Sequence, residues 1–291
     1  MVTASVGHGP SLDRLVADIG TELTSTERRL AELVLADPTR VAFDTVAELA
    51  ERADTSGPSV MRFATRLGFD GYSAMQRFVR NDLAARLTRP TDRIRSDEPA
   101  DAHEAARRNA HTSIDEAFDR ATPDEIASMA DVIAHACGRV WIVASEASSP
   151  VAQLLTSNLR LVRPGVVQVT GSAAAIAGAI VDAGPDDAVI AVDVERYERS
   201  VSDTARLLVE RGAVMVAITD GPLSPLAAAA THWCGVRVPS IGPFDSAVPI
   251  VAMAELVIAE VAARRRDAAT ERLDSAEHAW STLDAFGRGD R

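Results

Sequence analysis

The sequence predicts an all-α N-terminal domain joined to a doubly wound parallel α/β domain with a five-stranded sheet. Two observations lead to this fold class. Over the first ninety residues apolar positions recur at helical spacing and no strand-like run appears, whereas from Arg139 onward short Val/Ile/Ala runs alternate with amphipathic segments. The chain has 291 residues, which is enough for two domains of ordinary size.

The domain boundaries follow from the same change of pattern. The predicted parts are a helical domain (1–88), a linker with a connecting helix (89–123), an α/β domain (124–264) and a C-terminal helical tail (265–291). The linker begins with "RPTDRIRSDEPAD", which contains prolines and many charges, and this composition is typical of a segment between domains.

The first predicted helix spans residues 23–36. It opens with Thr24 and Glu27 at the spacing of a capping box, and it stops at the Asp37-Pro38 pair. A short turn is expected around Val41–Phe43.

Two short helices follow. The first begins at Thr45, which again has a glutamate, Glu48, three residues further on. The second lies within "DTSGPSVMRFATRLGF", with Ser56 as its N-cap, Pro58 in its first turn and Gly68 just past its end.

The link between these two helices is only about three residues long, 53–55, and such a tight connection is typical of a helix-turn-helix. On the second helix four apolar residues follow the i, i+3, i+4, i+7 pattern and are expected to face the core: Val60, Phe63, Ala64 and Leu67. The N-terminal part of such a helix enters the DNA major groove, where arginine can bind guanine or a phosphate. We therefore predict that the residues at its start and on its outward face contact double-stranded DNA: Ser56, Ser59, Met61, Arg62, Thr65 and Arg66.

The charge distribution agrees with that prediction. The formal net charge is −12, yet residues 52–95 carry nine arginines against four aspartates. A basic segment in an acidic chain is typical of a surface that faces phosphates, although on charge alone a solvated helix face is an equal alternative. The chain contains no lysine, which excludes a Walker A phosphate loop, a Schiff-base lysine and Ser–Lys catalysis.

The segment "LTSTERRLAELVLADPTRVAFDTVAELAERADTSGPSVMRFATRLGFDGY" (residues 23–72) resembles the N-terminal domain of the RpiR/MurR transcriptional regulators. The family pattern falls, without gaps, on Leu23-Thr24, Asp37-Pro38, Leu49-Ala50, Ser56, Ser59, Val60, Arg62-Phe63 and Leu67-Gly68-Phe69. The resemblance implies a one-component regulator, dimeric or tetrameric, that binds a palindromic operator.

The α/β domain is predicted from five buried-strand runs, each followed by a helix. The strands are expected at 140–144, 166–170, 188–194, 214–219 and 234–238, and the helices at 150–162, 172–181, 198–211, 223–230 and 246–263. Continuous apolar strands between amphipathic helices indicate a parallel sheet covered on both faces. Ligands of such sheets bind beyond the carboxyl ends of the strands, where the strand order reverses.

This half, roughly residues 124–263, resembles the sugar isomerase (SIS) domain, which in the family binds a phosphorylated sugar and builds the oligomer. Its first phosphate loop, Gly-x-Gly-x-Ser, is "ASEASSP" here, so that Ala144 and Glu146 replace both glycines while Ser148 keeps the serine position. We predict Ser145, Ser148 and Ser149 in an effector pocket, although Ser148 and Ser149 before a proline are also ordinary N-cap residues.

The second phosphate loop, Ser-x-Ser-Gly-x-Thr in the family, departs further. The matching stretch "AVDVERYERSV" places Asp193 and Glu195 at the two serines, Arg196 at the glycine and Glu198 at the threonine. Three acids at this place would repel phosphate, so the pocket is either degenerate, with solvated acids, or suited to a cationic or neutral ligand. Common sugar phosphates are expected not to bind.

The remaining patterns indicate neither an enzyme nor a metal protein. The six histidines lack metal-ligand spacing, two cysteines cannot build a disulfide framework, and no nucleophile elbow or dinucleotide fingerprint occurs, so no cofactor is expected. No signal peptide or membrane span is predicted, and a cytoplasmic location fits best. The alternatives are a sugar-phosphate isomerase or deaminase-like enzyme, and a DNA-binding architectural protein that takes no effector.

The tail is compatible with a helix. Its apolar residues Leu273, Ala276, Trp280 and Leu283 are expected to pack on a partner, and Arg264–Arg266 is interpreted as a solvated helix end.

Overall fold

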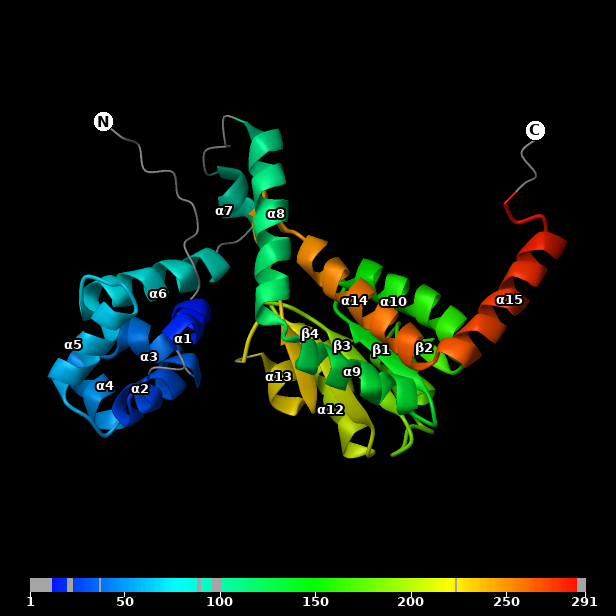
Figure 1. Ribbon diagram of the computed structural model, residues 1–291, viewed down its shortest axis with the longest axis horizontal. Coiled ribbons are helices and arrows are strands. Elements are labelled where there is room, and N and C mark those ends of the chain that lie inside the picture. Colours follow the sequence, from blue (N-terminus) through cyan, green and yellow to red (C-terminus); the bar gives the residue numbers. More distant parts are fainter. Residues whose placement is uncertain are drawn as a thin grey trace. The chain divides into compact units, whose positions relative to one another are not determined.

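The computed structural model describes residues 12–19, 23–36, 38–87, 90–95, 101–222 and 224–286. The chain divides into two compact units, residues 1–93 and residues 94–291. The first unit is helical throughout its described residues, and the second is built around a parallel sheet (Figure 1).

The first unit is a group of short helices around one apolar core. Its helices are α1 (Leu12–Ile19), α2 (Ser25–Ala36), α3 (Pro38–Phe43), α4 (Val46–Arg52), α5 (Gly57–Arg66) and α6 (Tyr72–Leu87), and α7 (Pro90–Arg95) spans the division between the units. The core includes Leu30, Leu49, Phe63 and Met75, which are fully buried. Because each helix contributes one apolar stripe to this core, their polar faces remain at the surface.

Both predicted capping boxes are present. The Thr45 hydroxyl accepts a hydrogen bond from the Glu48 amide at 3.3 Å, and the Glu48 carboxylate accepts one from the Thr45 amide at 2.7 Å. Thr24 and Glu27 make the same reciprocal pair at 3.3 and 2.9 Å. These bonds occupy amide groups that the helix itself leaves without partners at its start.

The turn expected around Val41–Phe43 is wrong, because these residues form the second half of α3. Pro38 opens this helix, where its fixed φ angle suits the first helical turn. Val41 and Ala42 are fully buried in the core, so their burial stabilises a helix too short to show a periodic pattern. The helix α1 also has no counterpart among the predicted helices.

The second unit has the predicted five parallel strands, in the order β2-β1-β3-β4-β5. The strands are β1 (Val140–Ala144), β2 (Val166–Gln168), β3 (Ala188–Val192), β4 (Val214–Thr219) and β5 (His232–Gly235). The helices are α8 (Ala102–Arg120), α9 (Pro123–His135), α10 (Ser149–Val162), α11 (Ala173–Ala179), α12 (Arg199–Glu210), α13 (Pro225–Ala229), α14 (Val248–Arg264) and α15 (Arg266–Thr282).

Helices cover both faces of this sheet, as predicted. Alternate strand residues such as Ile142, Ile190 and Ile218 share a core with α9, α10 and α14. Trp141 and Val189 belong to a second core with α12 and α13 on the opposite face (Figure 1). Burial on both faces explains why the strands read as continuous apolar runs.

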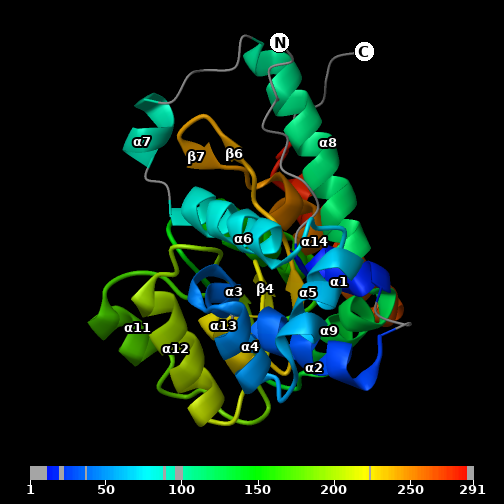
Figure 2. The ribbon, with the colours of Figure 1, turned by 90° about the vertical axis from the view of Figure 1, so that its left-hand side faces the viewer.

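Two features of the second unit differ from the prediction. The helix α8, which we assigned to the connecting segment, packs against α14 and β5. A hairpin of β6 (Ser240–Ile241) and β7 (Phe244–Asp245), which we did not predict, lies beside α8, where Asn109 donates a hydrogen bond to the Ser240 carbonyl at 3.3 Å (Figure 2). Strands of two residues carry no alternating pattern by which a sequence could reveal them.

Candidate functional site

The turn between α4 and α5 is fixed by hydrogen bonds to the last turn of α4 and by hydrogen bonds from α2. Asp54 has a left-handed φ of 47°, and its amide and that of Thr55 donate back into the last turn of α4 at 3.1 and 2.9 Å. Arg29 of α2 donates to the carbonyl oxygens of Ala53 and Asp54 at 3.1 and 3.0 Å. The angle at which α5 leaves α4 is therefore set by backbone and side-chain contacts together.

The helix α5 is anchored by its inward face. Val60, Phe63 and Ala64 are fully buried and Leu67 is nearly so, as the spacing predicts. At its end Gly68 takes a φ of 89°, and the Gly68 and Phe69 amides donate to carbonyls of the last turn at 3.0 and 3.1 Å. This is the Schellman arrangement, which requires a left-handed residue at the position that glycine occupies.

Three of the predicted DNA-contacting residues form a connected polar group on the outward face. The Ser59 hydroxyl lies 3.0 Å from the Ser56 hydroxyl and accepts a hydrogen bond from Arg62 Nη2 at 3.0 Å. Ser56 holds the predicted N-cap position, but its side chain makes no capping bond. The hydroxyl lies within hydrogen-bond distance of the Ser59 hydroxyl instead.

The other three predicted residues differ in the exposure and the hydrogen bonds of their side chains. Met61 is 44% exposed, and Thr65 is exposed with its hydroxyl donating to the Met61 carbonyl at 3.1 Å. Arg66 instead pairs with Glu27 of α2 at 3.1 Å, and only 31% of its side chain is exposed. Arg66 thus joins two helices, which its outward position on a helical wheel does not indicate.

The effector-pocket residues lie at the carboxyl edge of the sheet. The strand order reverses between the neighbours β1 and β3, so the residues after them, 145–148 and 193–198, emerge side by side. We call these two segments the switch-point loops. The Ser145 amide donates to the carbonyl of Val192 on β3 at 3.3 Å, which joins the two loops at their base.

Asp193 is buried at the centre of the switch-point loops. Its two carboxylate oxygens accept hydrogen bonds from the amides of Val194 at 3.0 Å and Glu198 at 2.8 Å. Burial raises the pKa of Asp193 to about 6, although these bonds and the nearby Ser145 hydroxyl act in the opposite direction. The Ser145 hydroxyl is buried near Asp193 and lowers the pKa of that carboxyl. Its angles and distances do not amount to a hydrogen bond with any atom in the described part of the chain.

Glu198 connects the two loops. Its Oε1 accepts a hydrogen bond from the Glu146 amide at 2.7 Å, so a carboxylate of the second loop occupies an amide of the first. Arg196, at the family's glycine position, has a left-handed φ of 73°, and Glu195 is half-buried. Amides that could bind an anion at this edge are therefore engaged by the chain's own carboxylates.

The remaining two predicted pocket residues, Ser148 and Ser149, lie at the start of α10. Ser148 is buried in the N-cap position but makes no side-chain capping bond, so ordinary capping does not explain its hydroxyl. Ser149 is the first residue of α10 and is half-buried.

Sequence reasoning missed a second polar group at this edge. Tyr197 donates to Asp220 Oδ1 at 2.7 Å, and the buried Thr219 hydroxyl lies 2.6 Å from that of Ser224. Burial and the Asp220 charge raise the pKa of Tyr197. These residues come from three separate segments, and no short sequence motif joins them.

Two kinds of site have no candidate in the described part of the chain. No group of three or more histidine, cysteine, aspartate or glutamate side chains there could hold a metal ion. No helix there has the length and apolar character needed to cross a membrane.

Comparisons with known proteins agree with both halves of the structure. Residues 12–86 match the model of the helix-turn-helix domain of the rpiR family, and residues 133–260 match the SIS domain model. The HTH-type transcriptional regulator HexR of Pseudomonas aeruginosa is 25% identical over 224 residues, which cover 75% of this chain and 76% of HexR.

Two solved structures share the fold. The sugar isomerase domain of the RpiR transcription factor from Sphaerobacter thermophilus has a TM-score of 0.57 at 24% identity and covers 60% of this chain and 97% of its own. The Vibrio vulnificus NanR protein complexed with ManNAc-6P has a TM-score of 0.57 at 18% identity and covers 94% of this chain and 98% of its own. With its helix-turn-helix and SIS halves in this order, the chain belongs to the RpiR family of helix-turn-helix transcriptional regulators.

Proposed function

We propose that this regulator binds a palindromic DNA operator through the outward face of α5, as a dimer or tetramer. The observation that carries the proposal is the connected group of Ser56, Ser59 and Arg62 at the start of a helix whose other face is locked in the core. A helix held this firmly presents its side chains in one geometry, which is what reading a base sequence requires.

The residues have different proposed roles. Arg62 is suited to a bidentate contact with guanine or to a phosphate, and the Ser56 and Ser59 hydroxyls to the DNA backbone. Met61 offers an exposed apolar group that can contact a thymine methyl. Arg66 is assigned a supporting role, because its ion pair with Glu27 holds α5 against α2.

For the SIS domain we propose an effector other than a simple sugar phosphate, or none. In the switch-point loops the Glu146 and Glu198 amides already bind the carboxylates of Glu198 and Asp193. A phosphate would have to displace these groups and would also meet their negative charge. At ~4 Å and an effective dielectric of about 20, each such like-charge pair costs about 4 kcal/mol.

The DNA-binding proposal is tested by selecting an operator from random sequence and titrating it in a gel-shift assay at fixed salt. Arg62→Ala should weaken specific binding by about 1–3 kcal/mol. The matched control is Arg206→Ala, which removes an exposed arginine from α12 in the second unit and should leave affinity unchanged. If Arg62→Ala binds as tightly as Arg206→Ala, α5 is not the reading helix.

A further inference from the structure

The C-terminal helix α15 carries an apolar surface that the described part of the chain leaves largely uncovered. Of its residues Arg266–Thr282 only Ala269 is buried, and α15 packs on α10 and α14 through its beginning while its second half extends away from the sheet (Figure 1). Isolated helices of this length are marginal in water even with good helix-forming sequences. A second half with so few contacts is therefore expected to need a partner.

The spacing of the apolar residues indicates what kind of partner. Ala269, Leu273, Ala276, Trp280 and Leu283 are separated by four, three, four and three residues, which is the a/d spacing of a coiled coil. We call Leu273, Ala276, Trp280 and Leu283 the tail stripe. Leu273 is 39% exposed and Leu283 77% exposed, and the half-buried Trp280 indole has the Phe286 ring edge-on at 5.4 Å between centroids.

The charges beside the stripe favour a parallel pair of identical helices. With Leu273 and Trp280 at a positions, Arg272 is at g and Glu277 at e, five residues apart. Arg272 Nη2 donates to the Arg160 carbonyl on α10 at 2.7 Å, but the residue remains exposed and keeps further N–H groups for a partner. In a parallel coiled coil g of one helix faces e of the next heptad in the other, so Arg272 and Glu277 would pair twice across a two-fold axis. An antiparallel pair centred between Ala276 and Trp280 would instead bring the two Glu277 side chains together.

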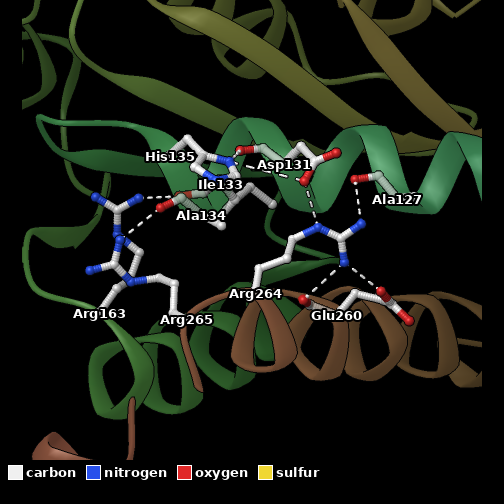
Figure 3. A network of polar contacts seen from close by, with 9 residues as sticks. All are labelled: Ala127, Asp131, Ile133, Ala134, His135, Arg163, Glu260, Arg264 and Arg265. Atoms are coloured by element: carbon white, nitrogen blue, oxygen red, sulfur yellow. Dashed lines mark hydrogen bonds and ion pairs between the residues drawn. The ribbon is translucent and has the colours of Figure 1, made fainter. Parts of the chain in front are cut away.

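The base of α15 is held rigidly, so the stripe has a fixed direction within its unit. Arg264 donates to the Asp131 carboxylate at 2.6 Å and to the Ala127 carbonyl at 3.2 Å, and it pairs with Glu260 at 2.5 Å (Figure 3). Arg265 donates to the Ala134 carbonyl at 2.7 Å.

A third arginine, at the end of α10, binds the same end of α9. The buried Arg163 donates to the Ile133 carbonyl beside that of Ala134, and burial lowers its pKa (Figure 3). The end of α9 is thus bound by Arg163 from α10 and by Arg265 from the junction of α14 and α15.

We propose that the tail stripe binds the tail stripe of a second copy of this chain, as a parallel two-stranded contact in the regulator dimer. The proposal rests on the proposed self-association but not on DNA binding. It locates one interface of the dimer at α15, at the end of the chain farthest in sequence from the reading helix.

Cysteine cross-linking of the full chain tests the contact directly. In a Cys137→Ser background, which removes the exposed native thiol, Ala276→Cys should oxidise to a disulfide-linked dimer. The matched control is Glu271→Cys, two positions before the first residue of the stripe and on the other side of the helix, which should remain monomeric on a non-reducing gel. If the chain is dimeric by light scattering but Ala276→Cys fails to cross-link, or cross-links no faster than Glu271→Cys, the interface lies elsewhere and the proposal is wrong.

A charge exchange tests the parallel register. Arg272→Glu and Glu277→Arg should each weaken self-association about tenfold in analytical ultracentrifugation, because each replaces two attractive pairs by two repulsive ones. The double variant Arg272→Glu/Glu277→Arg restores both pairs and should recover most of the affinity. If all three variants self-associate equally weakly, or all three self-associate like the wild type, the parallel pairing is wrong. Operator binding measured on the same samples reports separately on the proposed function.

Discussion

At the scale of single residues, Asp193 joins two roles that are usually separate: it is a buried acid and also the acceptor that shapes a loop. Its pKa is raised to about 6, well above the value of 3.8 for an unperturbed aspartate. The folded protein therefore binds this proton more tightly than the unfolded chain does. The resulting stabilisation is fully present below about pH 3.8 and is lost as the pH rises through about 6.

This leads to a prediction about pH. Between pH 4.5 and 7.5 the unfolding free energy of the wild type should fall by about 2 kcal/mol relative to that of Asp193→Asn, which has no proton to lose. The comparison uses the change with pH, so the fixed cost of replacing one accepting oxygen cancels. Urea unfolding of both proteins at the two pH values measures it. Parallel pH profiles would show that Asp193 has an ordinary pKa.

The same loop gives a prediction about ligands. Hexose and amino-sugar phosphates should show no binding to the wild type in calorimetry, because Asp193 and Glu198 hold the loop amides. The variant Asp193→Ser, Glu195→Ser, Arg196→Gly, Glu198→Thr restores the family's residues and should gain measurable phosphate affinity. Its control is the same titration with the unphosphorylated sugars, and micromolar binding of any sugar phosphate by the wild type contradicts the prediction.

How well single residues could be predicted depended on how close their partners are in the sequence. Ser56, Ser59 and Arg62 follow one another at three-residue spacing on one helix, so their proximity is readable from the sequence. The partner of Arg66 is 39 residues away on another helix, and a helical wheel shows only that Arg66 faces outward. The switch-point loops could be predicted in part. Their proximity follows from the sheet topology, but the hydrogen bonds between them do not.

At the scale of elements, the end of α5 depends on one left-handed residue. Gly68 has no atom within 4 Å of the place where a Cβ would stand, so an added methyl group meets no neighbour and its cost comes from φ alone. Gly68→Ala should therefore destabilise the first unit by about 1–2 kcal/mol.

The matched control is the same substitution in a helix. Gly178 lies within α11, where an added Cβ would likewise meet no atom within 4 Å, and its φ is not left-handed. Gly178→Ala should leave stability unchanged or raise it by up to about 1 kcal/mol. Thermal unfolding followed by circular dichroism distinguishes the two, and equal shifts for both variants would show that the Schellman end of α5 contributes nothing.

Elements with strong local signals were predicted well, and short ones were not. Capping boxes, the proline at the start of α5 and apolar strand runs are local features, and they led to five strands in a parallel sheet. The helix α3 and the β6–β7 hairpin have too few residues for a periodic pattern, and they are stabilised by contacts with distant parts of their units. The interpretation of Arg264–Arg266 as a solvated helix end is wrong for Arg264 and Arg265, whose guanidinium groups bind α9. Because these partners lie more than 130 residues earlier in the chain, no local pattern reveals them.

At the scale of the whole molecule, the uneven charge of the chain separates its two halves. The nine arginines of residues 52–95 belong almost entirely to the unit that carries α5, although the chain as a whole is acidic. An acidic SIS half limits unspecific attraction to DNA, so binding should depend on the contacts of the first unit. This division of charge is readable from the sequence, which beyond the spacing and charges of the tail stripe carries no information on the symmetry of the assembly.

That symmetry can be read from the operator. If two chains are related by a two-fold axis, their α5 helices face the same side of the duplex only when the half-sites are about one helical turn apart, or an integral number of turns. Inserting about five base pairs between the half-sites should therefore reduce affinity to that of a single half-site, and inserting about ten should restore much of it. A gel-shift series over insert lengths at fixed salt measures this periodicity. The control is the Arg62→Ala protein, which should bind more weakly at every spacing but keep the same periodicity. Affinity that is independent of the insert in the wild type would show that each helix-turn-helix binds DNA alone, and the dimer would then have no role in choosing the operator.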